Sequence, residues 1–225
     1  MPAGTVLVLG ALTGCAGHPD GRAAARTGAS PLADPDRIAR TVVATRRSLL
    51  AEVSAIQEAA AVLDRVDEAC AAGQGVAART ARRVAAPMRA RAQSARAGLT
   101  ASEAAYARAL DALARSSREP AVAAATAAGR SELASIRSFA AVVGEVQPRY
   151  DRLAADEQTW IVRALTPWYR SIREGADAYA VLQHDTRPAL EAGRQRLAAA
   201  SQDVVTASSA ASTALRAADR SLHGR

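Results

Sequence analysis

Residues 35–72, PDRIARTVVATRRSLLAEVSAIQEAAAVLDRVDEACAA, decide the fold of this 225-residue chain. Apolar side chains recur there every seven residues, at Val42, Leu49, Ile56, Leu63 and Cys70. A spacing of seven places these side chains on one stripe of an α-helix, as in coiled-coil packing. Asp34 can cap free backbone amides ahead of this stretch, and Pro35 suits the first helical position. We therefore predict a helix from about residue 35 to 72.

Glycine and proline mark the ends of a second helix. Gly73-Gln74-Gly75 ends the first helix, and Ser117-Arg118-Glu119-Pro120 forms the next turn, so a helix is expected from about residue 76 to 118. Gly98 is followed by Thr-Ala-Ser-Glu at residues 100–103, which resembles a capping box and predicts a break in this helix. Short connections of this kind favour antiparallel neighbours.

From Pro120 onward the sevenfold periodicity continues, but it is interrupted by proline. Pro148 and Pro167 are expected to kink or divide the helices in which they fall. Thr166-Pro167 is expected to begin a helix, and Asp185-Thr186 ahead of Pro188 is expected to begin the last one. The chain therefore contains four or five predicted helices.

The composition favours helices over strands. Alanine fills 60 of the 225 positions, whereas valine, isoleucine and the seven aromatic residues are thinly scattered. All 29 basic residues are arginine, and lysine and asparagine do not occur, a bias typical of GC-rich coding sequences. We predict an all-α fold, namely an antiparallel bundle of four or five long helices with Ala-rich, coiled-coil-like packing, in a single domain over residues 34–223.

The most specific motif lies near the amino terminus. A short apolar run from Val6 leads into Leu12-Thr13-Gly14-Cys15, a leucine and two small residues ahead of a cysteine. This pattern resembles the lipobox of bacterial lipoproteins. The resemblance implies that residues 1–14 are a signal peptide and that diacylglycerol is attached to Cys15. The apolar run is too short to span a bilayer as a helix, which agrees with a removed signal.

Residues 15–33 have the composition of a flexible tether. They contain three glycines and two prolines with little helical periodicity, and a flexible chain of this length spans roughly 25 Å. Two or three acyl chains hold a protein on a bilayer far better than one. We expect a cell-membrane protein that is lipid-anchored on the extracytoplasmic side, with its helical domain held clear of the headgroups.

The second predicted helix carries an asymmetry of charge. No acidic residue occurs between Glu68 and Glu103, whereas six arginines do. On a helical wheel five of these arginines fall on one side of the helix, at Arg79, Arg82, Arg83, Arg89 and Arg96. The opposite, buried side is predicted to consist of Val84, Met88, Ala95 and Leu99.

Two interpretations of this arginine face remain open. The first is a binding strip for an anionic polymer or a headgroup layer, because guanidinium groups pair bidentately with phosphate and carboxylate. The second is a solvated face whose arginines pair with acids of the first helix, such as Asp64, Asp67 and Glu68. A specific nucleic acid partner is not expected, because the stretch lacks interleaved aromatic residues and any recognisable nucleic-acid-binding motif.

Five of the seven aromatic residues fall between residues 150 and 179. If this segment were one continuous helix, Tyr150, Trp168 and Tyr179 would face the core, and Tyr169 would be the most exposed member. Trp160 and Trp168 still mark the best place for a small apolar or aromatic ligand, because helix bundles build ligand sites between facing helices.

Patterns typical of catalysis and metal binding are missing from the sequence. Histidines 18, 184 and 223 are accompanied by no nucleophile elbow, metal-binding helix or Gly-rich phosphate loop, although Asp185 adjoins His184. Cys70 is expected to be a buried free thiol. A disulfide between Cys70 and Cys15 is possible only if Cys15 carries no lipid. We expect no enzyme, cofactor or metal.

The leading hypothesis is a non-enzymatic, lipid-anchored protein of the cell envelope with an interaction or scaffolding role. Its bundle would dock an anionic polymer, a headgroup layer or a protein partner through the Arg-rich helix. The alternative is a bundle that sequesters a small apolar or aromatic molecule near Trp160 and Trp168. An enzyme using His184 is the least favoured hypothesis.

Overall fold

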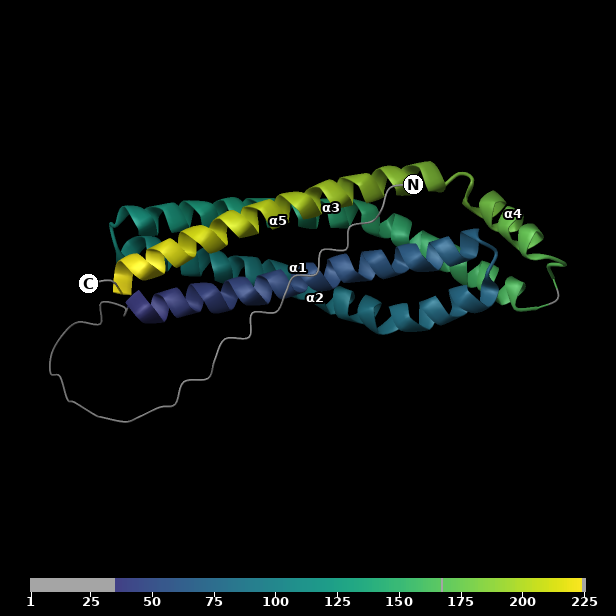
Figure 1. Ribbon diagram of the computed structural model, residues 1–225, viewed down its shortest axis with the longest axis horizontal. Coiled ribbons are helices and arrows are strands. Elements are labelled where there is room, and N and C mark those ends of the chain that lie inside the picture. Colours follow the sequence, from purple (N-terminus) through teal and green to yellow (C-terminus); the bar gives the residue numbers. More distant parts are fainter. Residues whose placement is uncertain (1–34, 167, 224–225) are drawn as a thin grey trace, which may run out of the picture. The chain divides into compact units, whose positions relative to one another are not determined.

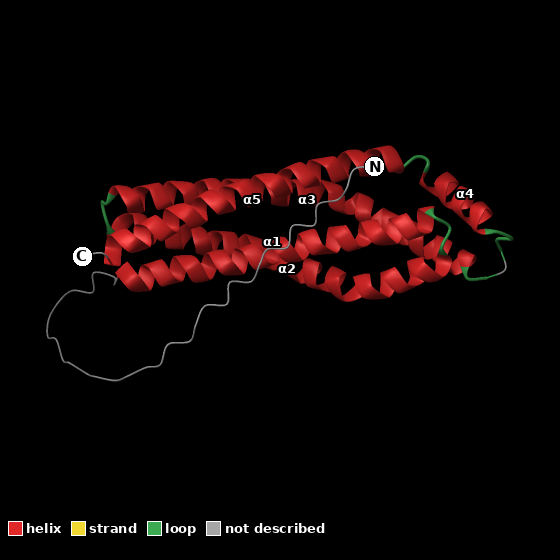
Figure 2. Cartoon of the chain, viewed as in Figure 1, coloured by secondary structure: helices red, strands yellow, loops and turns green. Residues whose placement is uncertain are grey.

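The computed structural model describes residues 35–166 and 168–223. Within these residues the chain forms five α-helices and no strand, as Figure 2 shows. The helices are α1 (Pro35–Ala71), α2 (Gly75–Ser116), α3 (Pro120–Ala164), α4 (Ile172–Gln183) and α5 (Arg187–His223). The four long helices alternate in direction, and α4 follows α3 at one end of the bundle (Figure 1). The predicted all-α helical bundle is confirmed.

The turn between α1 and α2 depends on one glycine. Gly73 has a φ angle of 70°, in the left-handed region, and a Cβ at this position would lie 2.2 Å from the carbonyl oxygen of Ile172. The Gly73 amide donates to the carbonyl of Cys70, and the Gln74 amide donates to that of Ala69. These two bonds form a Schellman motif, which ends α1 and turns the chain back along it. The predicted turn at residues 73–75 is confirmed.

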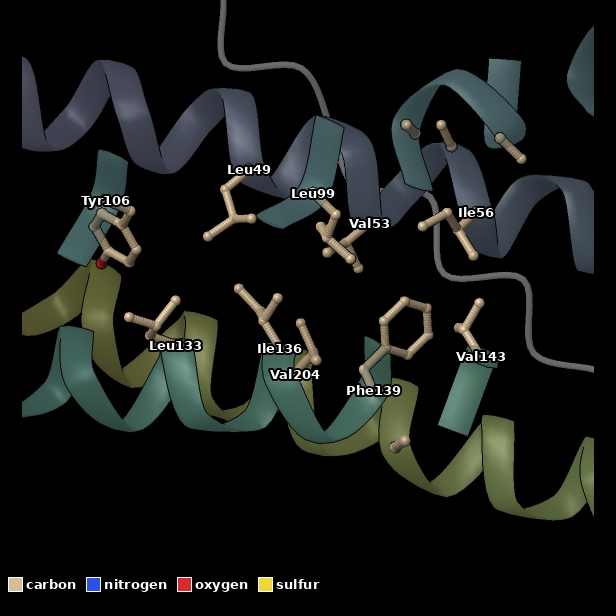
Figure 3. Packing of buried hydrophobic residues seen from close by; sticks show 14 of the residues in the cluster. Leu49, Val53, Ile56, Leu99, Tyr106, Leu133, Ile136, Phe139, Val143 and Val204 are labelled. Carbon is tan, nitrogen blue, oxygen red and sulfur yellow. The ribbon is translucent and has the colours of Figure 1, made fainter. Parts of the chain in front are cut away.

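The main core lies between the long helices (Figure 3). Leu49, Val53 and Ile56 of α1 point toward α3, which contributes Ile136 and Phe139 to the same layer. The predicted sevenfold stripe of α1 is buried along its whole length, from Val42 to Cys70. A second, smaller cluster lies near α4 and consists of Val62, Val66, Cys70, Ala78, Ala85, Trp160, Ile161 and Tyr179.

One buried polar network joins all four long helices within the main core. Arg46 of α1 donates to the carboxylate of Glu132 on α3 through Nε, at 2.8 and 3.0 Å, and through Nη2 at 2.8 Å. Arg46 Nη2 also donates to the carbonyl of Ser208 and to the hydroxyl of Ser212 on α5. The Tyr106 hydroxyl of α2 donates to Glu132 at 2.8 Å. Glu132 is thus fully buried but well supplied with donors.

Two predicted helix boundaries, at Gly98 and at Thr166, are wrong. Helix α2 runs through Gly98 without a break, because it packs against neighbouring helices on each side of this residue. Pro148, which was expected to kink or divide its helix, does not divide α3. Thr166 does not begin a helix, since its hydroxyl donates to the carbonyl of Arg163 at the end of α3. Instead, α4 begins at Ile172, after Ser171, whose hydroxyl accepts the amide of Glu174.

Several predictions concern residues outside the described ranges. These are the signal peptide at residues 1–14, the tether at 15–33 with the lipid-modified Cys15, the cap at Asp34, and Pro167. Cys70 is described, and it is a fully buried free cysteine, as predicted.

Arg46→Met tests the dependence of the fold on the four-helix network. The substitution leaves the Glu132 carboxylate buried with only Tyr106 as a partner, so we expect a loss of about 3–5 kcal/mol in the free energy of unfolding. The double variant Arg46→Met/Glu132→Leu removes the stranded charge and should regain much of this loss. Urea unfolding followed by circular dichroism measures both values.

The matched control is an exposed ion pair between α2 and α3. Arg130 and Asp111 lie 2.8 Å apart, but about half of each side chain is exposed to water. Arg130→Met should therefore cost less than about 1 kcal/mol. Equal losses in Arg46→Met and Arg130→Met would contradict the assigned role of the buried network.

Candidate functional site

Three arginines of α2, Arg82, Arg89 and Arg96, border its buried seam instead of lying opposite to it, whereas Arg79 and Arg83 are exposed. The buried residues in the first half of α2 are Ala78, Ala85, Ala92, Ala95 and Leu99. Arg82 and Arg89 lie three or four residues from these alanines, which places them at the edge of the same side of the helix. Val84, predicted to be buried, is 55% exposed. The predicted buried face is confirmed at Ala95 and Leu99 but wrong at Val84, because alanines form most of the seam in this part of the helix.

Arg82 is tied to the interior of the bundle. Its Nη1 donates to the carbonyl of Ala154 on α3 at 2.8 Å and lies 3.8 Å from the carboxylate of Glu157. Arg91, the sixth arginine, forms an exposed ion pair with Glu58 of α1 at 3.5 Å. Neither guanidinium is fully available to a partner from outside the chain.

The other four arginines of this stretch lack such partners. Within the described part of the chain, Arg79, Arg83, Arg89 and Arg96 have no carboxylate within 4.0 Å. Arg79 and Arg83 are exposed, whereas Arg89 and Arg96 are half-buried. Half-burial removes part of the water around a guanidinium, and these two side chains gain no compensating ion pair.

Two of the three α1 acids that were named as partners for the α2 arginines, Asp64 and Asp67, pair with other helices. Asp64 accepts from Arg194 of α5 at 2.8 Å. Asp67 accepts from Arg194 at 2.9 Å and from the Tyr179 hydroxyl of α4 at 2.7 Å. Burial raises the pKa of Asp64, although Arg194 opposes this effect. The prediction that Asp64 and Asp67 neutralise the α2 arginines is therefore wrong.

A narrow cleft opens between α2 and α3 beside the half-buried arginines. Arg89 and Arg96 line it from α2, and its apolar part is formed by Ile56 and Leu63 of α1 with Val146 of α3. Its narrow part has a volume of about 50 Å³, and it continues past Arg96 into a wider, open depression of about 480 Å³ toward Gly144. The cleft thus combines two unpaired cations with an apolar lining.

One carboxylate shares this cleft. Asp151 of α3 lines it and accepts a hydrogen bond from Gln147 at 2.7 Å. Tyr150, on the same side, is buried, and burial together with Asp64 raises its pKa to about 12. At neutral pH the cleft therefore contains two guanidinium groups, one carboxylate and a neutral phenol, and its net charge is positive.

The two tryptophans proposed for a ligand site are not brought together. Trp160 is 1% exposed in the smaller core cluster, and its indole N–H donates to the carbonyl of Gly175 at 2.8 Å. Trp168 is 72% exposed. Tyr169 is half-buried and stacks on Trp160, with ring centroids 6.5 Å apart. The predicted exposure of Tyr169 and burial of Trp168 are therefore reversed, because the segment after Ala164 is not helical and the helical wheel does not apply to it.

The structure reveals a buried carboxyl group that the sequence gave no reason to single out. Glu157 of α3 is fully buried, and neither of its carboxyl oxygens has a hydrogen-bond partner. Burial, reinforced by the nearby Asp67, raises the pKa of Glu157 to about 8, while Arg82, Arg89 and Arg194 oppose the rise. Glu157 is therefore mainly protonated at neutral pH. The only indication of this buried carboxyl in the sequence is the position of Glu157 on the buried side of α3.

The described residues contain no arrangement typical of a metal centre or a membrane span. No three His, Cys, Asp or Glu side chains within them come together to hold a metal ion. None of the five helices is long and apolar enough to cross a bilayer. His184 is exposed, and its Nδ1 lies 3.0 Å from the carboxylate of Asp185, which is also exposed.

The chain matches no protein-family model, no curated protein and no solved structure.

Glu157→Gln tests the electrostatic cost of the buried carboxyl. The pKa of Glu157 rises from 4.5 to about 8 on folding, so between these values the folded protein holds a proton that the unfolded chain releases. Wild-type stability should therefore fall as the pH rises through this range, by up to about 1.4 kcal/mol per pH unit from this group. The glutamine variant lacks this term, so its stability relative to wild type should increase with pH.

Urea unfolding at pH values from about 5 to about 8 measures this difference. Asp203→Asn, which removes an exposed carboxylate from α5, is the control. A difference between Glu157→Gln and wild type that stays constant across this range would show that Glu157 is ionised throughout.

Proposed function

We propose that this chain is a non-enzymatic, lipid-anchored protein of the cell envelope whose helical bundle docks an anionic partner. The lipobox resemblance at Leu12-Thr13-Gly14-Cys15 supports the anchor and the extracytoplasmic location. The unpaired arginines of α2 support the docking role. The partner is an anionic polymer, a headgroup layer or the acidic surface of a protein.

The observation that carries the docking role is the environment of Arg89 and Arg96. Both guanidinium groups are half-buried beside the cleft between α2 and α3, and neither has a carboxylate within 4.0 Å in the described structure. A phosphate or carboxylate bound there gains charge-assisted hydrogen bonds from donors that are already partly desolvated and held in place by the helix. Arg79 and Arg83 extend this cationic strip toward the start of α2, whereas Arg82 does not belong to it.

The open form of the cleft favours docking over sequestration of a small molecule. Its narrow part measures about 50 Å³ and continues into an open depression, whereas an engineered cavity known to hold benzene encloses roughly 150 Å³. The ligand site suggested near Trp160 and Trp168 has less support still, because one of these side chains lies in the core and the other in solvent.

Arg89→Gln/Arg96→Gln tests the docking site. In the full chain carrying Cys15→Ser, which excludes lipid attachment, we expect this double variant to bind immobilised heparin about tenfold more weakly at low salt. Two charge-assisted contacts are lost, and about 1.4 kcal/mol corresponds to a factor of ten. Elution from a heparin column along a salt gradient measures the change.

The matched control is Arg108→Gln/Arg115→Gln. These exposed arginines lie on the same helix with the same spacing of seven residues, so the control removes the same charge at another place. The control should keep most of its retention. Equal loss in both double variants would show that heparin senses only net charge, and it would overturn the assignment of Arg89 and Arg96.

Mass spectrometry of the mature protein tests the anchor. When the chain is expressed in a bacterium that processes lipoproteins, we expect the mature amino terminus to be Cys15 carrying diacylglycerol, and the protein to be found in the membrane fraction. The Cys15→Ser variant should carry no lipid. An unmodified Cys15, or a disulfide between Cys15 and Cys70, would contradict the proposed location.

A further inference from the structure

Exposed apolar side chains are concentrated at the end of the bundle where α4 lies. Of the nine large hydrophobic side chains exposed in the described structure, two, Val43 and Val84, lie elsewhere. The other seven, which we call the apolar end, are Val76, Val162, Leu165, Trp168, Ile172, Val181 and Leu182. They come from the first turn of α2, the end of α3, the connection that follows it, and α4. Figure 1 shows these elements together at one end of the helices.

Two close backbone approaches hold these elements against one another. A Cβ at Gly73 would lie 2.9 Å from the Cγ2 atom of Ile172, so the first residue of α4 rests on the α1–α2 turn. A Cβ at Gly75 would lie 2.9 Å from the Cβ of Ala164, so the start of α2 rests on the end of α3. The exposed side chains next to these contacts therefore form a surface of fixed geometry.

Trp168 is held outward by the residues around it. The next residue, Tyr169, stacks on the buried ring of Trp160 with an interplanar angle of 23°. Trp160 is itself fixed by the hydrogen bond from its indole N–H to Gly175. The carboxylate of Glu174 accepts the amide of Arg170 at 2.9 Å, which fixes the approach to α4. With its neighbour anchored in the core, the Trp168 ring stands 72% exposed, at a substantial cost in exposed apolar area.

The sixteen residues of sequence around Trp168 carry only positive charges, and Glu174, which follows them, is the nearest acid in α4. Residues 158–173 contain no Asp or Glu and three arginines, Arg163, Arg170 and Arg173, all of which are exposed. Arg79 of α2 is also exposed and lies one turn beyond Val76. Tryptophan favours the boundary between headgroups and acyl chains, and arginine near it pairs with anionic headgroups. Tryptophan and arginine are also enriched at protein interfaces, but a run of exposed positive charge without acidic residues in the same segment favours an anionic bilayer.

We propose that the apolar end is a membrane-insertion surface for a bilayer with anionic headgroups. Trp168, Leu165 and Ile172 enter the boundary below the headgroups, and Arg163, Arg170 and Arg173 pair with lipid phosphates. This surface is distinct from the cleft at Arg89 and from any lipid on Cys15. It lies at the far end of α1 from Pro35, and a helix of 37 residues spans about 55 Å. The proposal therefore does not depend on the docking role or on the lipid anchor.

Tryptophan fluorescence of the full chain carrying Cys15→Ser reports insertion at Trp168 directly. Trp160 is buried and Trp168 is exposed, so the difference between this chain and its Trp168→Phe variant gives the signal of Trp168 alone. With vesicles of phosphatidylcholine and phosphatidylglycerol, we expect a blue shift of this signal and quenching by lipids brominated near the headgroup. The signal that remains in Trp168→Phe should not be quenched. Any binding by residues 1–14 is common to both proteins and cancels.

Two pairs of variants separate the apolar contribution from the charge. Trp168→Ser/Ile172→Ser should reduce the partition into these vesicles at least about tenfold, whereas Val43→Ser/Val84→Ser, which removes exposed valines elsewhere, should leave it unchanged. Arg163→Gln/Arg170→Gln/Arg173→Gln should lower binding to anionic vesicles but not to pure phosphatidylcholine vesicles. Its control is Arg108→Gln/Arg115→Gln/Arg118→Gln, which removes equal charge from exposed positions near the opposite end of α2.

Three outcomes would overturn the proposal. The first is a Trp168 signal that does not change with anionic vesicles while the protein remains folded by circular dichroism. The second is an equal loss of binding in the serine variants of the apolar end and in the valine control. The third is a concentration-dependent dimer, detected by light scattering, that Trp168→Ser/Ile172→Ser abolishes while vesicle binding persists. That result would assign the surface to a second copy of the chain.

Discussion

The carboxylate of Glu132 on α3 constrains the whole bundle, because it is buried and takes its donors from two other helices. These donors are Arg46 of α1 and the Tyr106 hydroxyl of α2, and Arg46 in turn donates to the Ser212 hydroxyl of α5. Alanine-rich seams pack closely, but they discriminate poorly between registers that differ by one turn. A shift of any one helix would leave a buried charge or a buried hydroxyl without its partner. The free-energy cost of that loss is larger than the difference in apolar packing between the two registers. The network therefore fixes the register that the small side chains leave undetermined.

The other end of the bundle is organised by a different polar group. There Asp67 accepts hydrogen bonds from Tyr179 and Arg194, and so connects α1 with α4 and α5. Glu157, in the same region, has no hydrogen-bond donor, and Arg82 stops 3.8 Å from it. Because a buried neutral carboxyl is far less costly than a buried ion, this arrangement is tolerable only while Glu157 keeps its proton. The end that displays the apolar surface thus also contains a buried carboxyl group without a hydrogen-bond partner.

The parts of the fold that the sequence predicts are those governed by local rules. The sevenfold stripe from Val42 to Cys70 and the Schellman turn at Gly73 depend on spacing and on backbone geometry, and both are found. Periodicity fails where side-chain size misleads, since Val84 is exposed while smaller alanines fill the seam. Periodicity also fails at Trp168, because this residue lies in a connection that is not helical. Glu157 and the pairing of Asp64 depend on which distant helix lies opposite, and no local pattern contains that information.

The pairing of charges between helices leaves the unpaired positive charge of the bundle concentrated on α2. Asp64 and Asp67 of α1 face Arg194 of α5, so α1 leaves most α2 arginines without a partner. These arginines begin at Arg79 beside the apolar end and continue to Arg89, fourteen residues into the helix and about 21 Å from its start. A bilayer at the apolar end and an anionic partner at the cleft therefore need not compete. The excess charge of α2 would attract both, and its exposed arginines nearest Val76 would be shared between them.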